Sequence, residues 1–108
     1  MEILEYLNVD GDSPFRGWFD ALDATAAAKI TVAISRIRVG NLSNVKGVGG
    51  GVQEYRIDFG PGYRIYFGRD GETLVILLSG GTKRRQQADI ATAQARWADY
   101  KRRKKGTA

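Results

Sequence analysis

Apolar side chains recur at two different spacings along this chain, and the spacing changes near residue 40. In the N-terminal third they return every three or four positions, which is the spacing of one face of an α-helix. Ser13 followed by Pro14 is typical of a helix start, Asp23 can cap a second helix, and Gly40 is placed to end it. The apolar stripes are Phe15, Trp18, Phe19 and Leu22 on the first helix, and Ala27, Ile30, Ile34 and Ile37 on the second.

Beyond a loop at residues 40–51, which holds five glycines, the pattern is typical of β-strands. Three apolar runs are separated by Gly-Pro-Gly and by Arg-Asp-Gly, and both of these are turn signals. The predicted elements besides the two helices are strands at 2–7, 52–59, 63–67 and 73–79 and a final helix at 83–103. This order of strand, two helices, three strands and helix indicates an α+β fold with a mostly antiparallel sheet.

The odd-numbered positions of the central hairpin are apolar, so we expect them to share the core face of the sheet. These positions are Tyr55, Ile57, Phe59, Tyr63, Ile65 and Phe67. Pairing position 59 with 63 and 57 with 65, around a three-residue loop, satisfies that pattern. This register predicts Arg56 opposite Tyr66, and Asp58 opposite Arg64, on the other face. The run 73–79 is apolar on both sides, which predicts a strand inside the sheet.

The length of 108 residues predicts a single domain over residues 1–108. The chain has no cysteine and no histidine, which excludes disulfides, thiol catalysis, zinc fingers and imidazole chemistry. The aspartates show no metal-ligand spacing, so we expect neither a metal nor a cofactor. No apolar run approaches the roughly 20 residues of a membrane span. Glu2 and Glu5 stand where a signal peptide would be positively charged, and we therefore expect a cytoplasmic protein.

The net charge of +5 is distributed unevenly. Residues 1–30 carry two basic and six acidic side chains, whereas residues 82–108 carry nine basic and two acidic ones. A basic C-terminal end is typical of a protein that binds a polyanion, most simply a nucleic acid. A solvated helix with a frayed basic tail, at about residues 101–108, explains the same charge run equally well.

Arg56, Arg64 and Tyr66 form a predicted polar cluster on one sheet face, near Lys46 and Lys83 on flanking loops. Guanidinium groups bind phosphate oxygens through paired hydrogen bonds, and lysine adds a point charge. Fixed positive charges around one phosphate can stabilise the extra charge of a pentacovalent transition state. Because ribose supplies its own 2′-OH nucleophile, such an RNA-cleaving site needs no catalytic serine, cysteine or metal. The alternative interpretation is a weak cross-strand ion pair of Arg64 with the facing aspartate, beside a solvated Arg56.

Three motifs of this chain are similar to those of a known superfamily. They are Glu54-x-Arg56-Ile57, Gly62-Tyr63-Arg64-Ile65-Tyr66-Phe67 and Gly80-x-x-Lys83. Over about residues 2–100 the chain resembles the RelE/ParE superfamily of toxin–antitoxin toxins, and most closely the phage-derived, HigB-like addiction module killer proteins. The resemblance implies a RelE-like α+β fold. In that fold two N-terminal helices pack on a mostly antiparallel four-stranded sheet, and a C-terminal helix follows.

The resemblance also implies roles for individual residues. Arg64 matches the arginine that stabilises the phosphate in this superfamily, and Arg56 matches a contributing basic residue of the second strand. Lys83 and Arg84 match a basic pair just after the last strand, and Lys46 matches a basic loop residue. The implied catalytic residues are Arg56, Arg64, Lys83 and Tyr66, and the implied RNA-binding residues are Lys46, Arg84 and Arg85.

Two positions depart from the pattern of the superfamily. Asp58 stands where RelE members have a basic residue, and it could neutralise Arg64. The tyrosine or histidine that these toxins use for proton transfer near the C-terminus has no counterpart in the sequence from Gln86 onward. Tyr66, Lys46 and Asp89 are the candidates to replace it.

The implied activity is that of a ribosome-dependent mRNA endoribonuclease. It would be metal-independent, with 2′-OH attack and a transition state stabilised by arginine and lysine. The implied partners are mRNA on the ribosome and a cognate antitoxin of the helix-turn-helix type, with no membrane involved. Two alternatives remain open: a ParE-like inhibitor that binds DNA gyrase without chemistry, and a weakened toxin that only binds its antitoxin.

Overall fold

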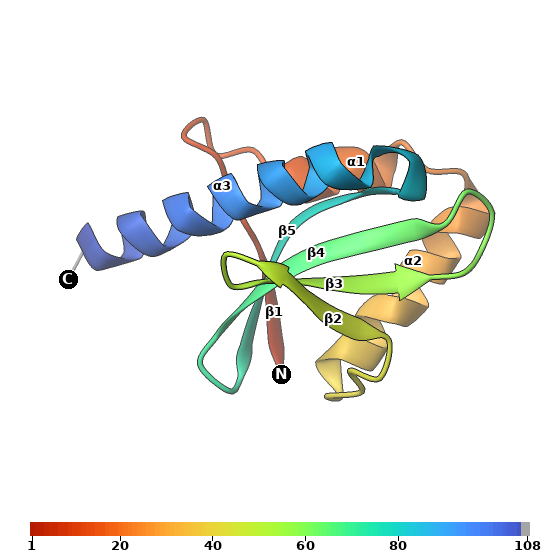
Figure 1. Ribbon diagram of the computed structural model, residues 1–108, viewed down its shortest axis with the longest axis horizontal. Coiled ribbons are helices and arrows are strands. Elements are labelled where there is room, and N and C mark those ends of the chain that lie inside the picture. Colours follow the sequence, from red (N-terminus) through yellow and green to blue (C-terminus); the bar gives the residue numbers. More distant parts are fainter. Residues whose placement is uncertain (107–108) are drawn as a thin grey trace.

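A mixed five-stranded sheet lies between helices on both of its faces in the computed structural model, which describes residues 1–106 (Figure 1). The elements are β1 (Glu2–Glu5), α1 (Pro14–Asp20), α2 (Ala24–Arg38), β2 (Val45–Gly49), β3 (Val52–Ile57), β4 (Tyr63–Asp70), β5 (Leu74–Thr82), a 3₁₀ turn (Lys83–Arg85) and α3 (Gln86–Gly106). No helix in the described part of the chain is both long and apolar enough to span a membrane.

The strand order is β1-β5-β4-β3-β2, with β1 parallel to β5 and the other neighbours antiparallel. The expected α+β class is confirmed, but the expected four-stranded sheet is corrected to a mixed sheet of five strands. The missed strand is β2, which lies in the stretch expected to be a loop. Two of its five residues, Gly47 and Gly49, are glycines, which weaken the sequence signal of a strand. The prediction that the strand after residue 73 lies inside the sheet is confirmed, because β5 pairs on both sides.

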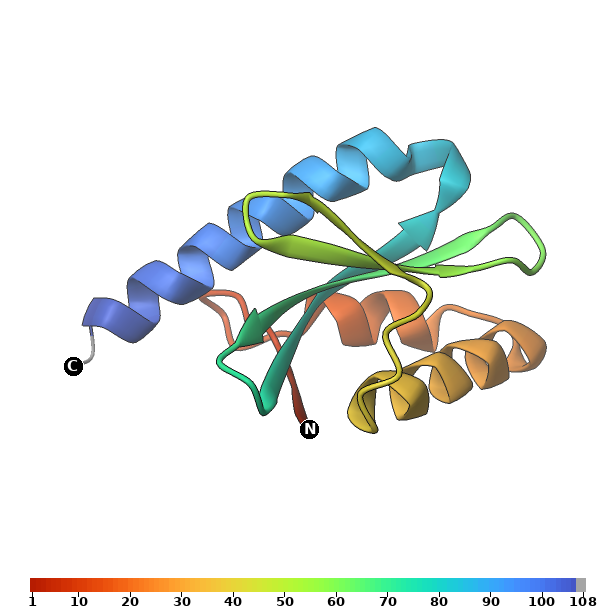
Figure 2. The same cartoon turned by 60° about the horizontal axis from the view of Figure 1, so that its bottom comes forward.

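The first two helices begin where the capping residues predict. The Ser13 side chain accepts a hydrogen bond from the backbone N–H of Arg16, and Asp23 accepts one from Ala26. Gly40, with a φ of 82°, follows the end of α2. Both helices pack on one sheet face (Figure 2), where the buried core comprises Phe15, Ile30, Ala33, Ile37, Tyr55, Ile65, Phe67, Val75 and Leu77.

Helix α3 covers the opposite face and begins three residues later than predicted, after the 3₁₀ turn. Its Trp97 side chain lies against Gly68 of β4, where a Cβ atom would come within 2.4 Å of the indole ring. The second buried cluster, beneath this helix, comprises Tyr6, Val52, Tyr66, Ile76, Leu78, Ala93 and Trp97. Exposed residues 101–106 of the predicted basic tail continue the helix, and the last two residues of that tail lie outside the described residues.

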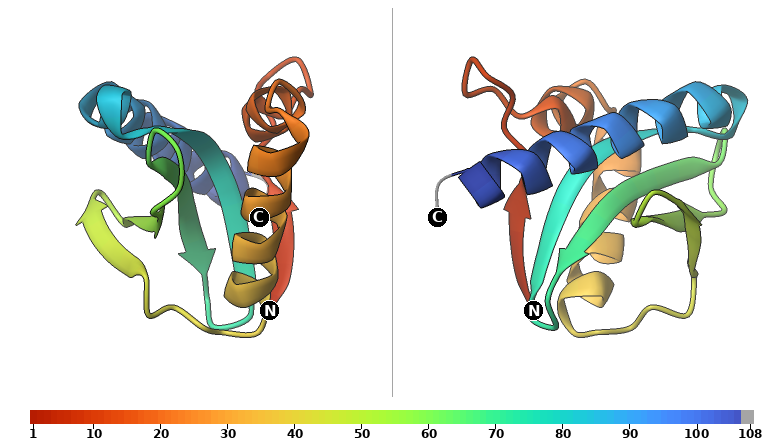
Figure 3. Two further views of the ribbon diagram at one scale, coloured as in Figure 1. Left: turned by 90° about the vertical axis from the view of Figure 1, so that its right-hand side faces the viewer. Right: turned by 60° about the vertical axis from the view of Figure 1, so that its left-hand side comes forward.

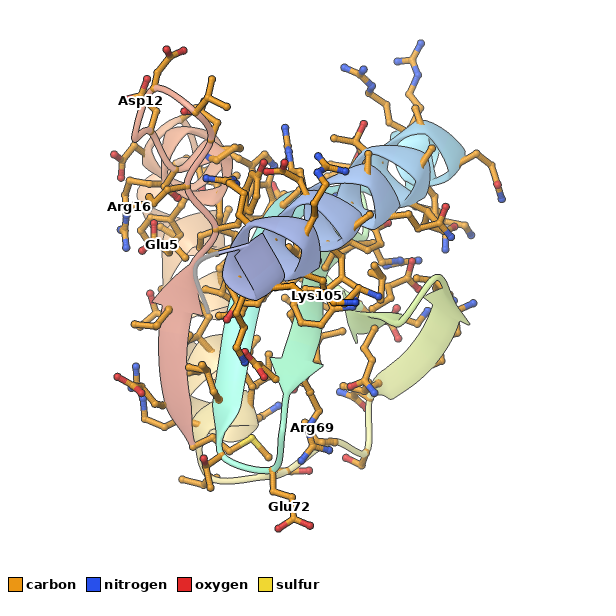
Figure 4. All side chains as sticks on the ribbon, turned by 90° about the vertical axis from the view of Figure 1, so that its left-hand side faces the viewer. Glu5, Asp12, Arg16, Arg69, Glu72 and Lys105 are labelled. Carbon is orange, nitrogen blue, oxygen red and sulfur yellow. The ribbon has the colours of Figure 1, made fainter. Side chains whose placement is uncertain are left out.

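The N-terminal strand is tied to α1 by an ion pair between Glu5 and Arg16, whose nearest atoms are 2.6 Å apart (Figure 4). Glu5 also accepts a hydrogen bond from the hydroxyl of Ser13 at 2.6 Å. These contacts hold the pKa of Glu5 below its ordinary value, although its partial burial acts in the opposite direction. They fix the edge of the sheet that lies farthest from β2.

The hairpin register differs from the predicted one by two residues. Tyr55 pairs with Ile65, and Arg56 pairs with Arg64 rather than with Tyr66. The physical reason is the turn, because residues 58–62 all leave the strands and Gly62 closes the turn with an N–H···O bond to Phe59. A shift of two preserves the alternation of faces, so the expected core face is kept. The shift removes the aspartate at position 58 from the ladder.

Candidate functional site

A buried carboxylate, Glu54, lies at the centre of a cluster of cationic side chains on the α3 face of the sheet. One of its oxygens, Oε1, lies 3.9 Å from Nζ of Lys46, 4.0 Å from Nε of Arg56 and 3.8 Å from Nε of Arg64. Glu54 and Arg64 are almost completely buried, whereas about half of the Lys46 and Arg56 side chains is exposed. We call Lys46, Glu54, Arg56, Arg64 and Tyr66 the Glu54 cluster.

The sheet itself brings these residues together. Glu54 pairs with Lys46 of β2 on one side and with Tyr66 of β4 on the other, and Arg56 pairs with Arg64. Paired residues project from the same face, and residues two apart on a strand share it as well. Three neighbouring strands therefore place five polar side chains on one patch of the sheet. A buried ion cluster of this kind is costly to desolvate, so its net contribution to stability is small.

The start of α3 covers the inner part of the Glu54 cluster. The Gln86 side chain donates a hydrogen bond of 2.8 Å to Oε2 of Glu54, and Lys83 donates a backbone hydrogen bond of 2.8 Å to Gly62. Asp89 lies over Gly81 of β5, where a Cβ atom would come within 2.0 Å of a carboxylate oxygen. Burial raises the pKa of Asp89, and the positive charges of two arginines, Arg85 first, counteract it.

The Tyr66 side chain is fully buried beside Glu54. Burial raises the pKa of Tyr66 above its ordinary value, the negative charge of Glu54 raises it further, and Arg64 acts in the opposite direction. The phenol therefore carries its proton at neutral pH. The Tyr66 hydroxyl, Oε1 of Glu54 and Nε of Arg64 make no close hydrogen bond among residues 1–106, although they interact electrostatically with one another, and Oγ of the neighbouring Ser79 has no hydrogen-bond partner there either.

Four buried polar atoms without a close hydrogen bond, gathered on one face, are unusual in a folded protein. A buried polar atom with no partner at all costs about 1–3 kcal/mol of stability, and the ion pair of Glu54 with Arg64 offsets part of that cost for these two side chains. Proteins keep this kind of cost mostly where the groups serve binding or chemistry. The Glu54 cluster is therefore the strongest candidate site on the sheet.

The other predicted site residues lie at the edge of this cluster. Lys83, Arg84 and Arg85 form the 3₁₀ turn after β5, with their side chains exposed. Lys83 lies next to Gly62, which stands two residues before Arg64 of the cluster. A Cβ atom added to Gly62 would be 3.3 Å from Cβ of Lys83. Within the described residues, no group of three or more histidine, cysteine, aspartate or glutamate side chains is placed to hold a metal.

The expected pairing of Asp58 with Arg64 is wrong. Asp58 lies in the turn after β3, is exposed, and has no ion pair in the part of the chain that the structure describes. The carboxylate that meets Arg64 is Glu54, which sequence reasoning missed. The signal for it was present, because position 54 has the same parity as 56, 64 and 66 and therefore shares their face.

Comparison with known proteins places the central part of the chain within a described family. Residues 17–98 match the family model "Phage derived protein Gp49-like (DUF891)". The chain is also similar to an "Uncharacterized protein" of Haemophilus influenzae (strain ATCC 51907 / DSM 11121 / KW20 / Rd). The two are 43% identical over 81 residues, which is 74% of this chain and 82% of the relative. The matched span contains every residue of the Glu54 cluster.

Proposed function

This chain belongs to the phage-derived Gp49-like family, a RelE-like toxin family of addiction modules, and on that premise we propose that it cleaves mRNA on the translating ribosome. We place it in the HigB-like branch on the motifs around Arg56, Arg64 and Lys83. An antitoxin partner follows from the family, and the proposal adds that this antitoxin is of the helix-turn-helix type. The reaction assigned to the chain is metal-independent endonucleolytic cleavage in the cytoplasm.

The observation that supports this function best is the convergence of three cations on a single anionic oxygen. Lys46, Arg56 and Arg64 all lie within 4.0 Å of Oε1 of Glu54. A non-bridging phosphate oxygen carries a similar charge, so the same side chains can gather around a scissile phosphate. In RNA cleavage these charges would stabilise the dianionic pentacovalent transition state. Lys83 and the exposed arginines Arg84 and Arg85 would hold the flanking backbone.

The reaction needs one proton acceptor and one proton donor. The ribose 2′-O–P bond forms as the P–O5′ bond breaks, the 2′-OH proton leaves to a base, and the departing 5′-oxygen gains a proton. The cations and Gln86 already engage both oxygens of Glu54. Asp89, whose pKa is raised by burial, is the better acceptor, and Tyr66, which keeps its proton, is the donor.

Access to the innermost arginine requires a local movement. Arg64 is only 2% exposed, and its partner Glu54 is bound by Gln86 at the start of α3. Lys46 and Arg56 are open to solvent, so a phosphate meets them first. Breaking the Gln86–Glu54 hydrogen bond would then expose Arg64. Loop or helix-end movements of this size are common in enzymes.

An Arg64→Ala substitution tests the proposal. Induced wild-type protein is expected to arrest growth and to cut mRNA within translated codons, whereas Arg64→Ala should cut at least about 100-fold more slowly, as when one transition-state contact is lost. Arg38→Ala, on the exposed end of α2, is the matched control and should cut like the wild type. Cleavage at the wild-type rate by Arg64→Ala would contradict the role of this residue.

One observation favours a second candidate function. Arg64 is both buried and neutralised by Glu54, and a neutralised sheet face suits protein binding better than RNA cleavage. The alternative is thus a ParE-like inhibitor that binds DNA gyrase without chemistry. Inhibition of gyrase supercoiling by the purified protein, without any mRNA cleavage, would decide for this alternative.

A further inference from the structure

A cleft of about 600 Å³ separates α2 from the edge of the sheet formed by β2 and β3. Figure 3 (left) shows α2 and β2 on opposite sides of the view, joined along the bottom by the loop that follows α2. The lining of the cleft is partly apolar and includes Val32 and Ala33 of α2 and Ile57 of β3. This cleft lies on the α2 face of the sheet, whereas the Glu54 cluster lies on the α3 face, and Lys46 and Arg56 belong to both. Nothing in the proposed reaction uses the α2 wall of the cleft.

Both walls of the cleft carry cations. Lys29 and Arg36 line it from α2, and Lys46 and Arg56 line it from the sheet edge, whereas Asp58 is the single carboxylate along its lining. Lys29 and Arg36 are exposed and form no ion pair within residues 1–106. They are seven residues apart on one helix face, which separates them by about 10.5 Å along the helix axis. The cleft therefore presents two lines of positive charge.

We propose that this cleft binds the sugar–phosphate backbone of a single RNA strand and leads it to the Glu54 cluster. The inference rests on the proposed function. It adds Lys29 and Arg36 as RNA-binding residues that no motif of the sequence indicates. Lys46 and Arg56 belong to both places, since they line the cleft and also approach Glu54. A strand that leaves the cleft round the edge formed by β2 and β3 therefore stays in contact with Lys46 and Arg56, whose charged groups also approach Glu54.

The contacts at the mouth of the cleft favour the backbone rather than the bases. Phe59 is the aromatic ring best placed to stack on a base, but the ammonium group of Lys29 lies 5.0 Å from its centroid. Tyr63 stacks on the same ring with a centroid separation of 6.5 Å. The Phe59 ring is therefore already in contact with other side chains of the protein. We expect the cleft to bind RNA through its phosphate charges and without preference for base sequence.

An acidic peptide is the other polyanion that a basic cleft can accept. The continuity of charge with the Glu54 cluster favours RNA, because a peptide would gain nothing from delivery to a phosphate-binding site. Competition by an acidic peptide therefore distinguishes the two occupants.

The test measures binding of a fluorescein-labelled 12-nucleotide 2′-O-methyl RNA, which has no 2′-OH and cannot be cleaved by the proposed reaction. We expect Lys29→Gln/Arg36→Gln to weaken binding at least about fivefold and to reduce the slope of log K against log salt by about 1.4, as for two lost single-strand phosphate contacts. The matched control, Arg38→Gln/Lys105→Gln, removes the same charge outside the cleft and should bind within about twofold of wild type, since phosphate contacts act locally.

Equal binding by the two double variants would overturn the proposal, with folding of both checked by circular dichroism. Displacement of the RNA by a 12-residue poly-glutamate peptide at equal charge concentration would overturn it as well, in favour of a peptide site.

The cleft proposal and the proposed function can fail independently of each other. If the wild type cuts mRNA while Lys29→Gln/Arg36→Gln binds RNA normally, the cleft proposal alone fails. If that variant loses RNA binding while the wild type cuts no mRNA, the proposed function alone fails.

Discussion

Glu54 sets the properties of the side chains around it. Lys46, Arg56 and Arg64 all approach the same oxygen of Glu54, Oε1. The negative charge of the carboxylate holds these three cations together, although their like charges repel each other. The same negative charge, together with burial, keeps the neighbouring tyrosine protonated. One carboxylate that sequence reasoning missed therefore organises the candidate site.

Tyr66→Phe separates function from stability at this site. The hydroxyl is buried and makes no close hydrogen bond within residues 1–106, so removing it should leave the free energy of unfolding unchanged or raise it by about 1–3 kcal/mol. If Tyr66 donates the proton in cleavage, the same variant should cut mRNA about 100-fold more slowly or worse. Urea unfolding and a cleavage assay on the same preparation measure both effects. A clear loss of stability would mean that the hydroxyl is bound within the folded chain.

The sequence predicts some properties of individual site residues and not others. Parity along the strands correctly placed Arg56, Arg64 and Tyr66 on one face, because side-chain alternation is a local property. The partner of Arg64 depends on register, and register depends on how many residues the Gly-Pro-Gly turn takes from each strand. The burial of Arg64 depends on where α3 starts, which residues far apart in the chain decide together. Neither can be read from spacing alone.

At the scale of elements, α3 is the part that decides access to the site. Its first turn covers the Glu54 cluster, its middle packs through Trp97, and its last turns extend beyond the sheet (Figure 1). The capping residues of α1 and α2 predicted those helices well. The start of α3 was harder to predict, because Thr82 makes no side-chain cap and a 3₁₀ turn intervenes. Strand β2 was not predicted, because its two glycines weaken the sequence signal of a strand.

Gly68→Ala tests the docking of α3. The added methyl group would come within 2.4 Å of the Trp97 ring, which the surrounding core prevents from moving freely. We expect the free energy of unfolding to fall by about 1–3 kcal/mol, as in other overpacked cores. Gly47→Ala in β2 is the control, since nothing lies within 4 Å of its added methyl group. Thermal unfolding of the two variants gives the comparison, and equal stability would show that Trp97 does not pack on this glycine.

We expect the C-terminal turns of α3 to unfold at low pH. A hydrogen bond from Lys104 holds the pKa of Asp70 below its ordinary value of 3.8, and one from Tyr6 does the same for Asp99. Carboxylates with a lowered pKa in the folded state stabilise it above that ordinary value, and the contribution is lost as pH falls through the lowered pKa. We therefore expect helix signal at 222 nm to decrease below about pH 4. Asp70→Asn/Asp99→Asn should lack this transition, and an unchanged transition would contradict the assignment.

At the scale of the whole molecule, charge and architecture agree. The two core clusters cover the two faces of the sheet. The cations proposed to bind RNA lie on α2, on the neighbouring strands β2 and β3, and in the 3₁₀ turn after β5. The basic end of α3, which dominates the charge count, lies at the opposite end of the molecule from α2 (Figure 1). The sequence correctly predicted a basic α+β protein. The position of its functional charges required the observed strand order.

In the proposed reaction this chain cuts mRNA by attack of the ribose 2′-OH. The most direct measurement uses translating ribosomes and an mRNA with a single 2′-deoxynucleotide at the mapped cut position. We expect cleavage of the all-ribose mRNA, with a 5′-hydroxyl on the downstream product, and no cleavage of the deoxy-substituted one. Equal cleavage of both messages, or a downstream product that begins with a phosphate, would contradict it.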